Sequence, residues 1–543
     1  MGKYAYTSLS PDDFQSFAKD VLGSHNVKIV QHSEECIHLG LLVEELREGP
    51  IGTSTFRWLV SCQTTSLLEL DDDTDLGERI HKLQCDGFMG FYPNGVSDAL
   101  KVQLESIQSS SERRFEYIIY DAEQIDKLLD SLDAEKVNEM VEKYGIVNTP
   151  KLKVASFFSG GGGLDLGLEG GFAVHQESIN VLFYPEYKGL SSNWVSLKKT
   201  RFETILANDI ELKASIVWKQ YFSQTQVART YEIQSIVDLV NSWKNGVLSP
   251  PRNVDIVTGG FPCKDFSLSG KRLGFNSHKD HTGKITEDTV ENNRGKLYDW
   301  LSQAIGILSP KLFIAENVSA MESMEGVIET IQHDFQSIGD GYIVVMKKFK
   351  CIEYGIPQTR ERILFFGISK KHYKANWNYN DLSERLSIPV THALDIAEDS
   401  NLRPVVPALT YLRDLKEPDV TTDPSQQKYS KAKWLSKGQG QTEIKSDKPG
   451  PTIRAEHHGN IEFRRLSAEH GGSHIAELQS GLPERRLTVR ECARLQTFPD
   501  TYAFLPHISA SAAYKVIGNA VPPLLGFFIG NHLEKLWRDL FDA

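Results

Sequence analysis

The chain contains 543 residues, of which 40% are apolar and 24% are charged, and its formal net charge is −12. This length allows two to four domains with sizeable cores, and the composition is that of an ordinary globular protein. No stretch reaches the roughly 18 consecutive apolar residues of a membrane helix, and the first residues lack the apolar core of a signal peptide. The negative charge argues against non-specific coating of nucleic acid. We therefore expect no membrane association.

Residues 1–147 alternate strand-like and helical segments. The strand-like segments are "FRWLVSC", "DGFMGFY" and "FEYIIYD", and each is followed by a segment with helical periodicity. The turn "NTPK" then marks a boundary. This order predicts an N-terminal α+β domain over residues 1–147.

Residues 151–369 again alternate strands and helices. The expected strands are "KVASFFSG", "FETILANDI", "VDIVTGG", "LFIAENV", "YIVVMKKF" and "RILFFGI". Strands separated by helices predict a doubly wound, mostly parallel sheet with helices on both faces.

Residues 370–484 are irregular and rich in Pro, Gly, Ser and charged residues, whereas residues 485–543 return to helical periodicity. Residues 427–465 contain nine Lys or Arg and four acids, a local charge excess of about +5. By itself this run is most simply a solvated surface loop. The six cysteines of the chain are scattered without a CxxC pair, which indicates free thiols in a reducing cytoplasm.

A strand followed by a glycine cluster, "VASFFSGGGGLDLGLEGG", opens the region from residue 151. The strand ends near Phe158, and an amphipathic helix begins near Leu164. Glycines in this position let backbone amides and a helix N-terminus approach a ligand closely. The spacing matches neither the GxGxxG of dinucleotide enzymes nor a P-loop. The sequence predicts a ligand loop, and Asp209, which ends the next strand, is placed to bind ribose hydroxyls.

Cys263 lies on a turn after another strand, in "DIVTGGFPCKDFSLSG". A lone cysteine is as often a small buried hydrophobe as a reactive group, but Pro262 fixes the backbone beside this one. Glu316 ends the strand "KLFIAENV", and alternation places Arg360 and Arg362 of "GIPQTRERILFFGI" on one face. We expect these thiol, carboxyl and guanidinium groups to converge at one edge of the sheet. A surface salt-bridge cluster is the alternative.

These segments resemble the DNA (cytosine-5)-methyltransferase family over residues 151 to about 526. Six motifs in the family's order carry the resemblance: "FFSGGGGLDLG", "GGFPCKDFS", "PKLFIAENV", "YGIPQTRERILFFGI", "RRLTVRECARLQTFPD" and "VIGNAVPPLL". The resemblance implies a Rossmann-like, S-adenosylmethionine-dependent catalytic domain over 151–369. It also implies a target-recognition domain over 370–484 and a return to the catalytic domain over 485–543.

The family's chemistry implies roles for four of these residues. Cys263 would add to carbon 6 of cytosine, so that carbon 5 takes the methyl group from S-adenosylmethionine. Glu316 would hydrogen-bond ring nitrogen 3 and the exocyclic amine, and Arg362 would hold the oxygen at position 2, with Arg360 in support. Because a stacked duplex hides these atoms, the cytosine must be flipped out.

The resemblance also implies a cofactor site on the glycine loop, the neighbouring strand ends and the closing motif. The expected contacts are Phe158, Ser159, Gly160, Gly161, Gly162, Gly163, Asp209 on the ribose, Ile210 by the adenine, Glu232, Ile233, Pro262, Leu297, Asn519 and Val521. No metal site is expected.

The target-recognition region implies contact with double-stranded DNA, and its basic excess suits phosphates. Within "GPTIRAEHHGNIEFRR", Thr452 and Ile453 resemble the family's recognition dipeptide, and Arg454 follows them. Lys264, where the family commonly has Gln, is a further candidate for DNA contact. A bacterial restriction-modification enzyme is implied, monomeric and cytoplasmic, with a cognate restriction endonuclease as partner.

The first 147 residues lie outside this resemblance. Their order of strands and helices resembles the restriction-endonuclease-like fold, in which an acid and a lysine at a strand end hold a metal ion. Here Gln63 of "WLVSCQ" stands where that lysine would be. We therefore expect an inactive domain that binds DNA or docks a protein. A fused nuclease and a tRNA methyltransferase are the alternative functions.

Overall fold

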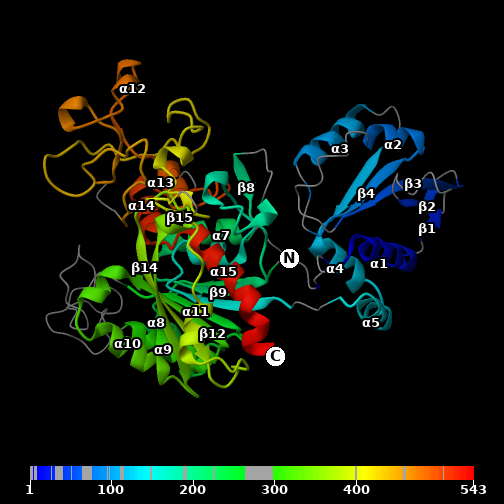
Figure 1. Ribbon diagram of the computed structural model, residues 1–543, viewed down its shortest axis with the longest axis horizontal. Helices are drawn as coiled ribbons and strands as arrows, with labels where there is room; N and C mark the ends of the chain where they lie inside the picture. Colours follow the sequence, from blue (N-terminus) through cyan, green and yellow to red (C-terminus); the bar gives the residue numbers. More distant parts are fainter. Residues whose placement is uncertain are drawn as a thin grey trace. The chain divides into compact units, whose positions relative to one another are not determined.

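Figure 1 shows the computed structural model of the chain. The structure describes all residues except 1–3, 5, 7–8, 26, 31–40, 50–51, 64–75, 94–95, 97, 111–114, 147–149, 188–192, 224–226, 263–296, 398–399, 456–459, 505–506 and 543. The chain divides into two compact units: Met1–Lys151 with Val181–Ser191, and Leu152–Asn180 with Ser192–Ala543. The further division of the second unit into catalytic and target-recognition domains stays a prediction.

The first unit is built on a five-stranded sheet in the order β1-β2-β3-β4-β5. Its strands are β1 (Lys28–Val30), β2 (Leu41–Gly49), β3 (Gly52–Cys62), β4 (Gly87–Phe91) and β5 (Glu116–Tyr120). The β1-β2 and β2-β3 pairs are antiparallel, whereas β3-β4 and β4-β5 are parallel. A parallel pair requires a crossover, and one helix supplies each crossover.

Both faces of this sheet are buried, because successive side chains of a strand point to opposite sides. Trp58 and Val60 of β3 belong to one core with Phe14 of α1, whereas Leu59 belongs to a second core with Leu104 of α3. The helices are α1 (Pro11–Ser24), α2 (Leu76–Lys82), α3 (Asp98–Ser110), α4 (Ala122–Asp130) and α5 (Ala134–Lys143). The unit is therefore a three-layer α/β structure.

The second unit contains a seven-stranded sheet in the order β10-β9-β6-β11-β12-β14-β13. Its strands are β6 (Leu152–Phe157), β9 (Phe202–Asn208), β10 (Thr230–Glu232), β11 (Ile256–Gly260), β12 (Leu312–Val318), β13 (Tyr342–Lys350) and β14 (Glu361–Ser369). Only β14 runs antiparallel to its neighbours within this described sheet. The sheet is mostly parallel, as the sequence predicts.

The strand order reverses between β6 and β11, because the chain moves from β6 outward through β9 and β10 and then returns to start the other half at β11. In open α/β sheets such a switch point leaves a crevice at the carboxyl ends of the two strands, where ligands bind. The glycine loop follows β6, and Cys263 follows β11. The topology thus directs both predicted loops to one place.

Helices cover both faces of this sheet. One face packs against α8 (Ile236–Lys244), α9 (Leu297–Leu308) and α10 (Val327–Gln336), which lie side by side in Figure 1. On the other face α6 (Gly163–Glu169) packs on α15 (Pro523–Trp537), where a Cβ on Gly167 would lie 2.6 Å from the Cα of Gly526. Two glycines therefore let these helices meet backbone to backbone.

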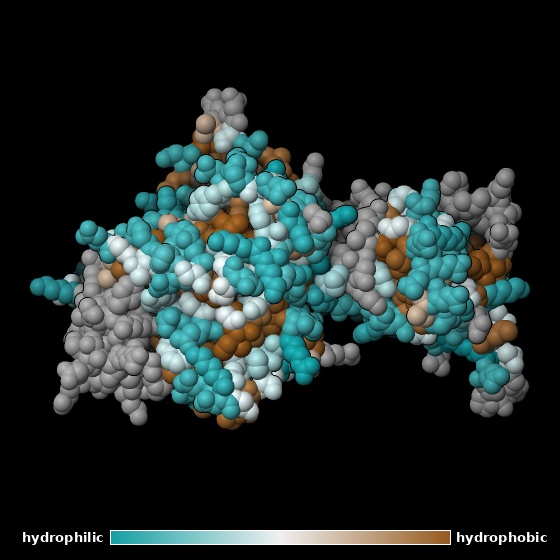
Figure 2. Space-filling model, turned by 90° about the horizontal axis from the view of Figure 1, so that it is seen from below, coloured by the Kyte–Doolittle hydropathy of each residue, from teal (hydrophilic) through white to brown (hydrophobic). Residues whose placement is uncertain are grey.

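The remaining elements are short, apart from the helices near the C-terminus. They are β7 (Ala173–His175), β8 (Trp194–Ser196), α7 (Leu212–Phe222), α11 (Tyr379–Arg385), β15 (His392–Ala393), β16 (Arg403–Pro404), β17 (Phe463–Arg465), α12 (Ile475–Gln479), β18 (Arg485–Arg486), α13 (Val489–Leu495) and α14 (Ala510–Asn519). The stretch Ala510–Asp542 is long and apolar enough to cross a membrane, but 83% of its most apolar window is buried inside the protein. Figure 2 shows a face on which hydrophilic residues predominate, with smaller apolar areas between them.

Candidate active site at the carboxyl edge of the second sheet

An acid and a guanidinium group meet where β11, β12 and β14 end or begin. The Oε1 atom of Glu316 lies 2.5 Å from Nε of Arg362, and both side chains are about 11% exposed. Glu316 pairs in register with Gly260, the last residue of β11, and a Cβ on that glycine would lie 3.1 Å from Glu316 Oε2. The sheet therefore presents this carboxyl group directly beside the exit of β11.

The chain that leaves β11 is fixed by a residue that the sequence reasoning did not place in the site. Asn317 is fully buried, and its Nδ2 atom donates to the carbonyl oxygen of Phe261 at 3.2 Å. Pro262 follows and is half-buried. Cys263 and Lys264 lie outside the described residues. The positions of Phe261 and Pro262 show only where the chain leads toward these two residues, and their roles stay predictions.

Arg360 does not join this acid–guanidinium pair, and its supporting role for Arg362 stays a prediction. Its side chain is buried, its Nη1 atom donates to the carbonyl oxygen of Ile453, and its Nη2 atom donates to that of Gly518, each at 3.0 Å. Gln358 adds a link, because its Oε1 atom accepts from Ile453 N at 3.2 Å. Arg360 is a positioning residue that joins the recognition segment to α14.

The glycine loop after β6 has the backbone that its sequence predicts. Phe158 and Gly160 adopt left-handed conformations with φ of +53°, and the amide of Gly160 donates to Oδ2 of Asp209 at 2.9 Å. Oδ1 of Asp209 accepts from the amide of Glu211 at 2.9 Å. Burial raises the pKa of Asp209. The Asp209 carboxylate thus lies at the end of β9, directly beside the loop. Ser159 of the loop adds a second link to β9, because its Oγ accepts from the amide of Asn208 at 3.2 Å.

The other glycines of the loop lie against neighbouring side chains and backbone. An added Cβ would lie 2.6 Å from Val516 at Gly161, 2.4 Å from Trp218 at Gly162 and 2.3 Å from the oxygen of Val521 at Gly163. These contacts place the closing motif against the loop, and the cofactor contact of Val521 stays a prediction. Asn519 is exposed beside it, and Leu297 is buried at the start of α9.

Two apolar side chains are exposed at the ends of adjacent strands. Ile210 is 51% exposed just beyond β9, and Ile233 is 41% exposed just beyond β10. Glu232, the last residue of β10, directly precedes Ile233. It is half-buried, and its carboxylate accepts from Gln234 at 3.2 Å. Exposed aliphatic groups next to a buried carboxylate suit a ligand with a flat apolar ring and a hydroxylated sugar. An adenosine group fits this arrangement.

The recognition segment only partly matches its prediction. The side chain of Ile453 is fully buried, so it has no surface with which to contact DNA. Thr452 is half-buried and donates to the carbonyl oxygen of Thr359 at 3.2 Å. Arg454 pairs with Glu462 at 2.9 Å, and Asn460 and Gln439 accept further hydrogen bonds from it. The direct DNA contact predicted for Ile453 is therefore corrected.

Buried arginines hold the region around the recognition segment together. Both carboxylate oxygens of Glu417 accept from Arg465 and Arg485, at 2.6–3.3 Å. Although burial opposes ionisation, these hydrogen bonds lower the pKa of Glu417 to about 2. Arg485 also pairs with Glu491 at 2.8 Å, and Arg490 pairs with Asp423 at 2.6 Å. Such charges stabilise a fold only as complete pairs.

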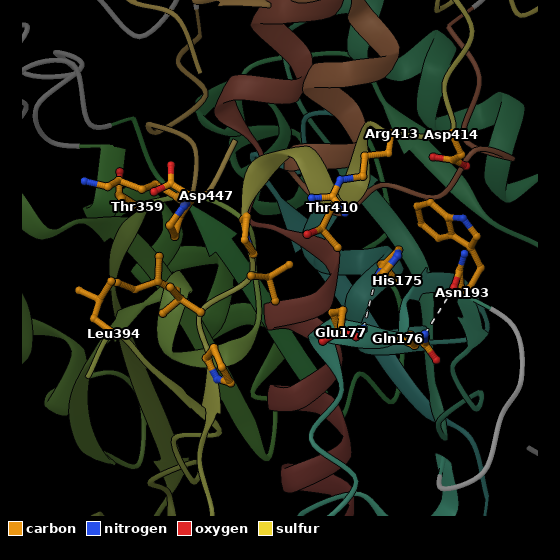
Figure 3. Close-up of a pocket in the computed structure, with 18 residues that line it drawn as sticks. His175, Gln176, Glu177, Asn193, Thr359, Leu394, Thr410, Arg413, Asp414 and Asp447 are labelled. Carbon is orange, nitrogen blue, oxygen red and sulfur yellow. Dashed lines mark hydrogen bonds between the residues drawn. The ribbon is translucent and has the colours of Figure 1, made fainter. Parts of the chain in front are cut away.

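A cavity of about 1140 Å³ lies apart from the acid–guanidinium pair (Figure 3). The β7–β8 hairpin, an insertion of unassigned role in the sequence, contributes His175 and Asn193 to one side of it, and Thr359, Leu394 and Asp447 lie across from them in the view. Its walls carry both acidic and basic groups. We assign it no ligand.

The fold and the site together define an α/β protein with a glycine-rich loop at the switch point and a paired acid and guanidinium group beside it. Residues 152–535 match the family model for C-5 cytosine-specific DNA methylase. The chain therefore belongs to this family, and the resemblance predicted from the six motifs is confirmed. It is a DNA (cytosine-5)-methyltransferase that uses S-adenosylmethionine as methyl donor.

Two Type II methyltransferases are similar to this chain over most of its length. The Type II methyltransferase M.BsuRI of Bacillus subtilis is 30% identical over 406 residues, which cover 71% of this chain and 80% of that protein. M.BspRI of Lysinibacillus sphaericus is 26% identical over 449 residues, covering 77% and 92%. Among solved structures, the S. pombe Dnmt2 methyltransferase is 16% identical with a TM-score of 0.43, covering 71% of this chain and 99% of that chain.

Proposed function

We propose that this chain methylates carbon 5 of a flipped cytosine within a short sequence of double-stranded DNA, through a covalent bond from Cys263 to carbon 6. The single observation that carries the proposal is the Glu316–Arg362 pair, which is held beside the strand exit that leads to Cys263. A thiol, an acid and a guanidinium group at one strand edge supply the nucleophile and the two ring contacts that cytosine needs.

The Cys263 thiolate would form a bond to carbon 6 and open the double bond between carbons 5 and 6. Carbon 5 would take the methyl group as the bond between this group and the sulfonium of S-adenosylmethionine breaks, and S-adenosylhomocysteine would leave. Glu316 hydrogen-bonds ring nitrogen 3 and the exocyclic amine, while Arg362 holds the oxygen at position 2 and orients Glu316. A base then removes the proton from carbon 5, and the bond between sulfur and carbon 6 breaks to return the thiolate.

For the cofactor, we propose the pocket formed by the glycine loop, Asp209 and the exposed Ile210 and Ile233. Asp209 would accept from the ribose hydroxyls, and the two isoleucines would flank the adenine. The other predicted contacts, Pro262 and Leu297 among them, complete the pocket in this proposal. The cofactor supplies an electrophilic methyl group, and the protein orients it toward the strand edge.

For phosphate contact, we propose the loop 428–441 in place of the segment around Ile453. Lys431, Lys433 and Lys437 are exposed, and no acidic partner is found for them within the described part of the chain. The buried guanidinium of Arg486 fixes the backbone of this loop, because it donates to the carbonyl oxygens of Ala432 at 2.7 Å and Lys433 at 3.0 Å. A basic loop with a fixed backbone binds phosphates at a lower entropic cost than a flexible one.

For the first unit, we propose a protein-docking role without nuclease activity. Residues 1–151 carry 14 Lys or Arg and 27 Asp or Glu, a net charge of −13. Such a charge repels a DNA backbone. Gln63 follows β3, and no group of three metal-ligating side chains occurs among the described residues. We further propose a monomer of the bacterial cytoplasm that protects DNA from a cognate restriction endonuclease.

The test is base-resolution sequencing of methylcytosine in DNA from cells that express the chain. We expect methylcytosine at one short motif for the natural chain and for Cys85→Ala, a matched cysteine variant in the first unit, and none for Cys263→Ala. Methylation by Cys263→Ala at the natural level would contradict the proposal. Methylcytosine in tRNA instead of DNA would replace the proposed substrate.

A further inference from the structure

A buried chain of hydrogen bonds lies beneath the proposed cofactor loop. Ser159 Oγ lies 2.8 Å from Ser156 Oγ, which in turn donates to Oδ1 of Asp165 at 2.6 Å. Oδ2 of Asp165 accepts from the indole nitrogen of Trp218 at 2.9 Å, and the amide of Asn208 donates to Ser159 Oγ at 3.2 Å. The chain of contacts thus joins β6, the loop, β9, α6 and α7.

Asp165 is the one group in this network that only accepts. Its side chain is 1% exposed, and each carboxylate oxygen takes one donor. An amide of the same size offers one neutral acceptor and one donor group, so it meets both partners only if Ser156 turns its hydroxyl to accept, and the two hydrogen bonds lose their charged acceptor. The indole of Trp218 also lies directly against the loop, because a Cβ on Gly162 would be 2.4 Å from it.

We propose that Asp165 is a positioning residue for S-adenosylmethionine, which holds the loop Gly160–Gly163 in its binding conformation through Ser156 and Trp218. The inference rests on the proposed placement of the cofactor on this loop. Asp165 does not touch the cofactor. It acts by fixing the backbone of the loop against β9 and α7, so its loss changes cofactor affinity before it changes the chemistry of methyl transfer.

The surroundings of Asp165 make this role dependent on pH. Burial raises the pKa of Asp165 to about 6, against the hydrogen bonds from Ser156 and Trp218. The charged neighbours are Glu169 on its own helix and Arg229, which pair with each other. Tyr231 and Tyr502 also face it, and both stay neutral, because burial raises their pKa values.

The sign of the pH effect follows from these contacts. As the pH falls from 7.5 to 5.5, the carboxyl group gains a proton, and the hydrogen bonds from Ser156 and Trp218 lose their charged acceptor. Tyr231 donates to the carbonyl oxygen of Gly160 at 2.9 Å, and Tyr502 donates to that of Gly161. These two bonds do not titrate in this range. Asp209, whose pKa burial also raises, accepts from the amide of Gly160, so Asp165 is one of two carboxyl groups that hold the loop.

The experiment is calorimetric titration of the full chain with S-adenosylmethionine at pH 7.5 and pH 5.5. At pH 7.5 we expect Asp165→Asn to weaken binding by about tenfold to a hundredfold, as for a lost buried hydrogen bond to a charged group. Asp209 is present in both proteins, so the difference between them is the readout: at pH 5.5 the affinity of the natural chain should fall more than that of the variant and approach it. An affinity within twofold of the natural chain, or a parallel pH dependence, would overturn the inference.

A second substitution separates positioning from misfolding. The double variant Asp165→Asn with Trp218→Phe changes both partners of one hydrogen bond, so its loss of affinity should be smaller than the sum of the two single losses. If Asp165→Asn fails to fold, as judged by thermal unfolding, Trp218→Phe alone decides: we expect weaker binding that keeps its pH dependence, and unchanged affinity would overturn the inference. Asp209→Asn tests the placement of the cofactor independently, since unchanged binding in that variant contradicts the proposed pocket instead.

Discussion

The two units of this chain share an architecture and differ in what their parallel strands carry at the carboxyl ends. In the first unit β3 is followed by Gln63 and β4 by the buried Tyr92. In the second unit β9 is followed by Asp209, and β12 carries Glu316 at its end. Residues 152–543 carry 46 Lys or Arg and 45 Asp or Glu, so their net charge is +1 against −13 for residues 1–151. A layered α/β sheet is a scaffold, and the strand-end residues decide whether it is an enzyme.

The largest difference between the two units is expected when one charge is removed from the acid–guanidinium pair of the second unit. Glu316→Gln keeps the shape of the side chain but removes the carboxylate that pairs with Arg362 and that we propose to bind the cytosine ring. We expect the rate of methyl transfer to fall by about 10²–10⁴-fold. Single-turnover kinetics with labelled S-adenosylmethionine measure the effect.

The control for this prediction lies in the first unit. Glu44→Gln removes a carboxylate that pairs with Arg57 at 2.9 Å, on a strand with no proposed catalytic role. Its methyl-transfer rate should stay within twofold of the natural chain. Equal losses of methyl-transfer rate in Glu316→Gln and Glu44→Gln would contradict the assignment of catalysis to the strand ends of the second unit.

A smaller effect is expected when the lysine loop loses its charge. Lys431, Lys433 and Lys437 changed together to Gln should lower DNA affinity and reduce the slope of log K against log salt by about 3, because each phosphate contact contributes about 0.9. Fluorescence anisotropy with a labelled duplex at several salt concentrations measures both quantities.

The matched control removes three exposed lysines elsewhere in the second unit. Lys370, Lys371 and Lys374 follow the C-terminal end of β14, far along the strand from Arg362 at its start. Their change to Gln should leave the salt slope within one of the natural value. A similar loss from both triple variants would show that only net charge matters.

Acidification should loosen the second unit through its buried arginines. The pKa of Glu417 is about 2 in the folded chain, below its ordinary value of 4.5. A carboxyl group with a lowered pKa stabilises the fold above its unfolded pKa and loses this contribution as the pH falls from about 4.5 to 2, here up to about 3 kcal/mol. Scanning calorimetry between pH 6 and pH 3 should show this loss, and Glu417→Gln should show a flatter pH dependence at lower overall stability.

The smallest effect is expected from restoring a lysine in the first unit. Gln63→Lys should create no metal-dependent cleavage of unmethylated plasmid, because a lysine alone does not assemble a metal site, and methylation should change by less than twofold. Gel analysis of supercoiled plasmid with Mg²⁺ measures cleavage. Cleavage of the plasmid by the natural chain would contradict the proposal that the first unit has no nuclease activity, and it would favour a fused nuclease.

Sequence patterns predicted the sheet and its strand-end residues well, because they are local. A strand period followed by glycine or by an acid places Asp209 and Glu316 without knowledge of the rest of the fold. The partners of Arg360 could not be found in this way. Its hydrogen bonds reach Ile453 and Gly518, which are 93 and 158 residues away, and alternation alone placed it with Arg362.

The basic excess of residues 427–465 misled for a related reason. A count of charges cannot separate exposed lysines from buried arginines. Arg464 and Arg465 pair with carboxylates of Glu417 and Glu477, which lie outside the counted window. Only the structure shows that the positive charge at the surface of this window lies on lysines, Lys431, Lys433 and Lys437 of the loop 428–441 and Lys445 and Lys448 after it.

The contact between α6 and α15 has a consequence for how the protein is made. The helix that follows the cofactor loop packs on a helix that leaves the ribosome some 360 residues later. At roughly 5–20 residues per second, the first unit is complete about 20–80 s before the second can close its sheet face. A chain truncated before Pro523 should keep a protease-resistant first unit and lose cofactor binding. Methylation therefore begins only when synthesis is finished.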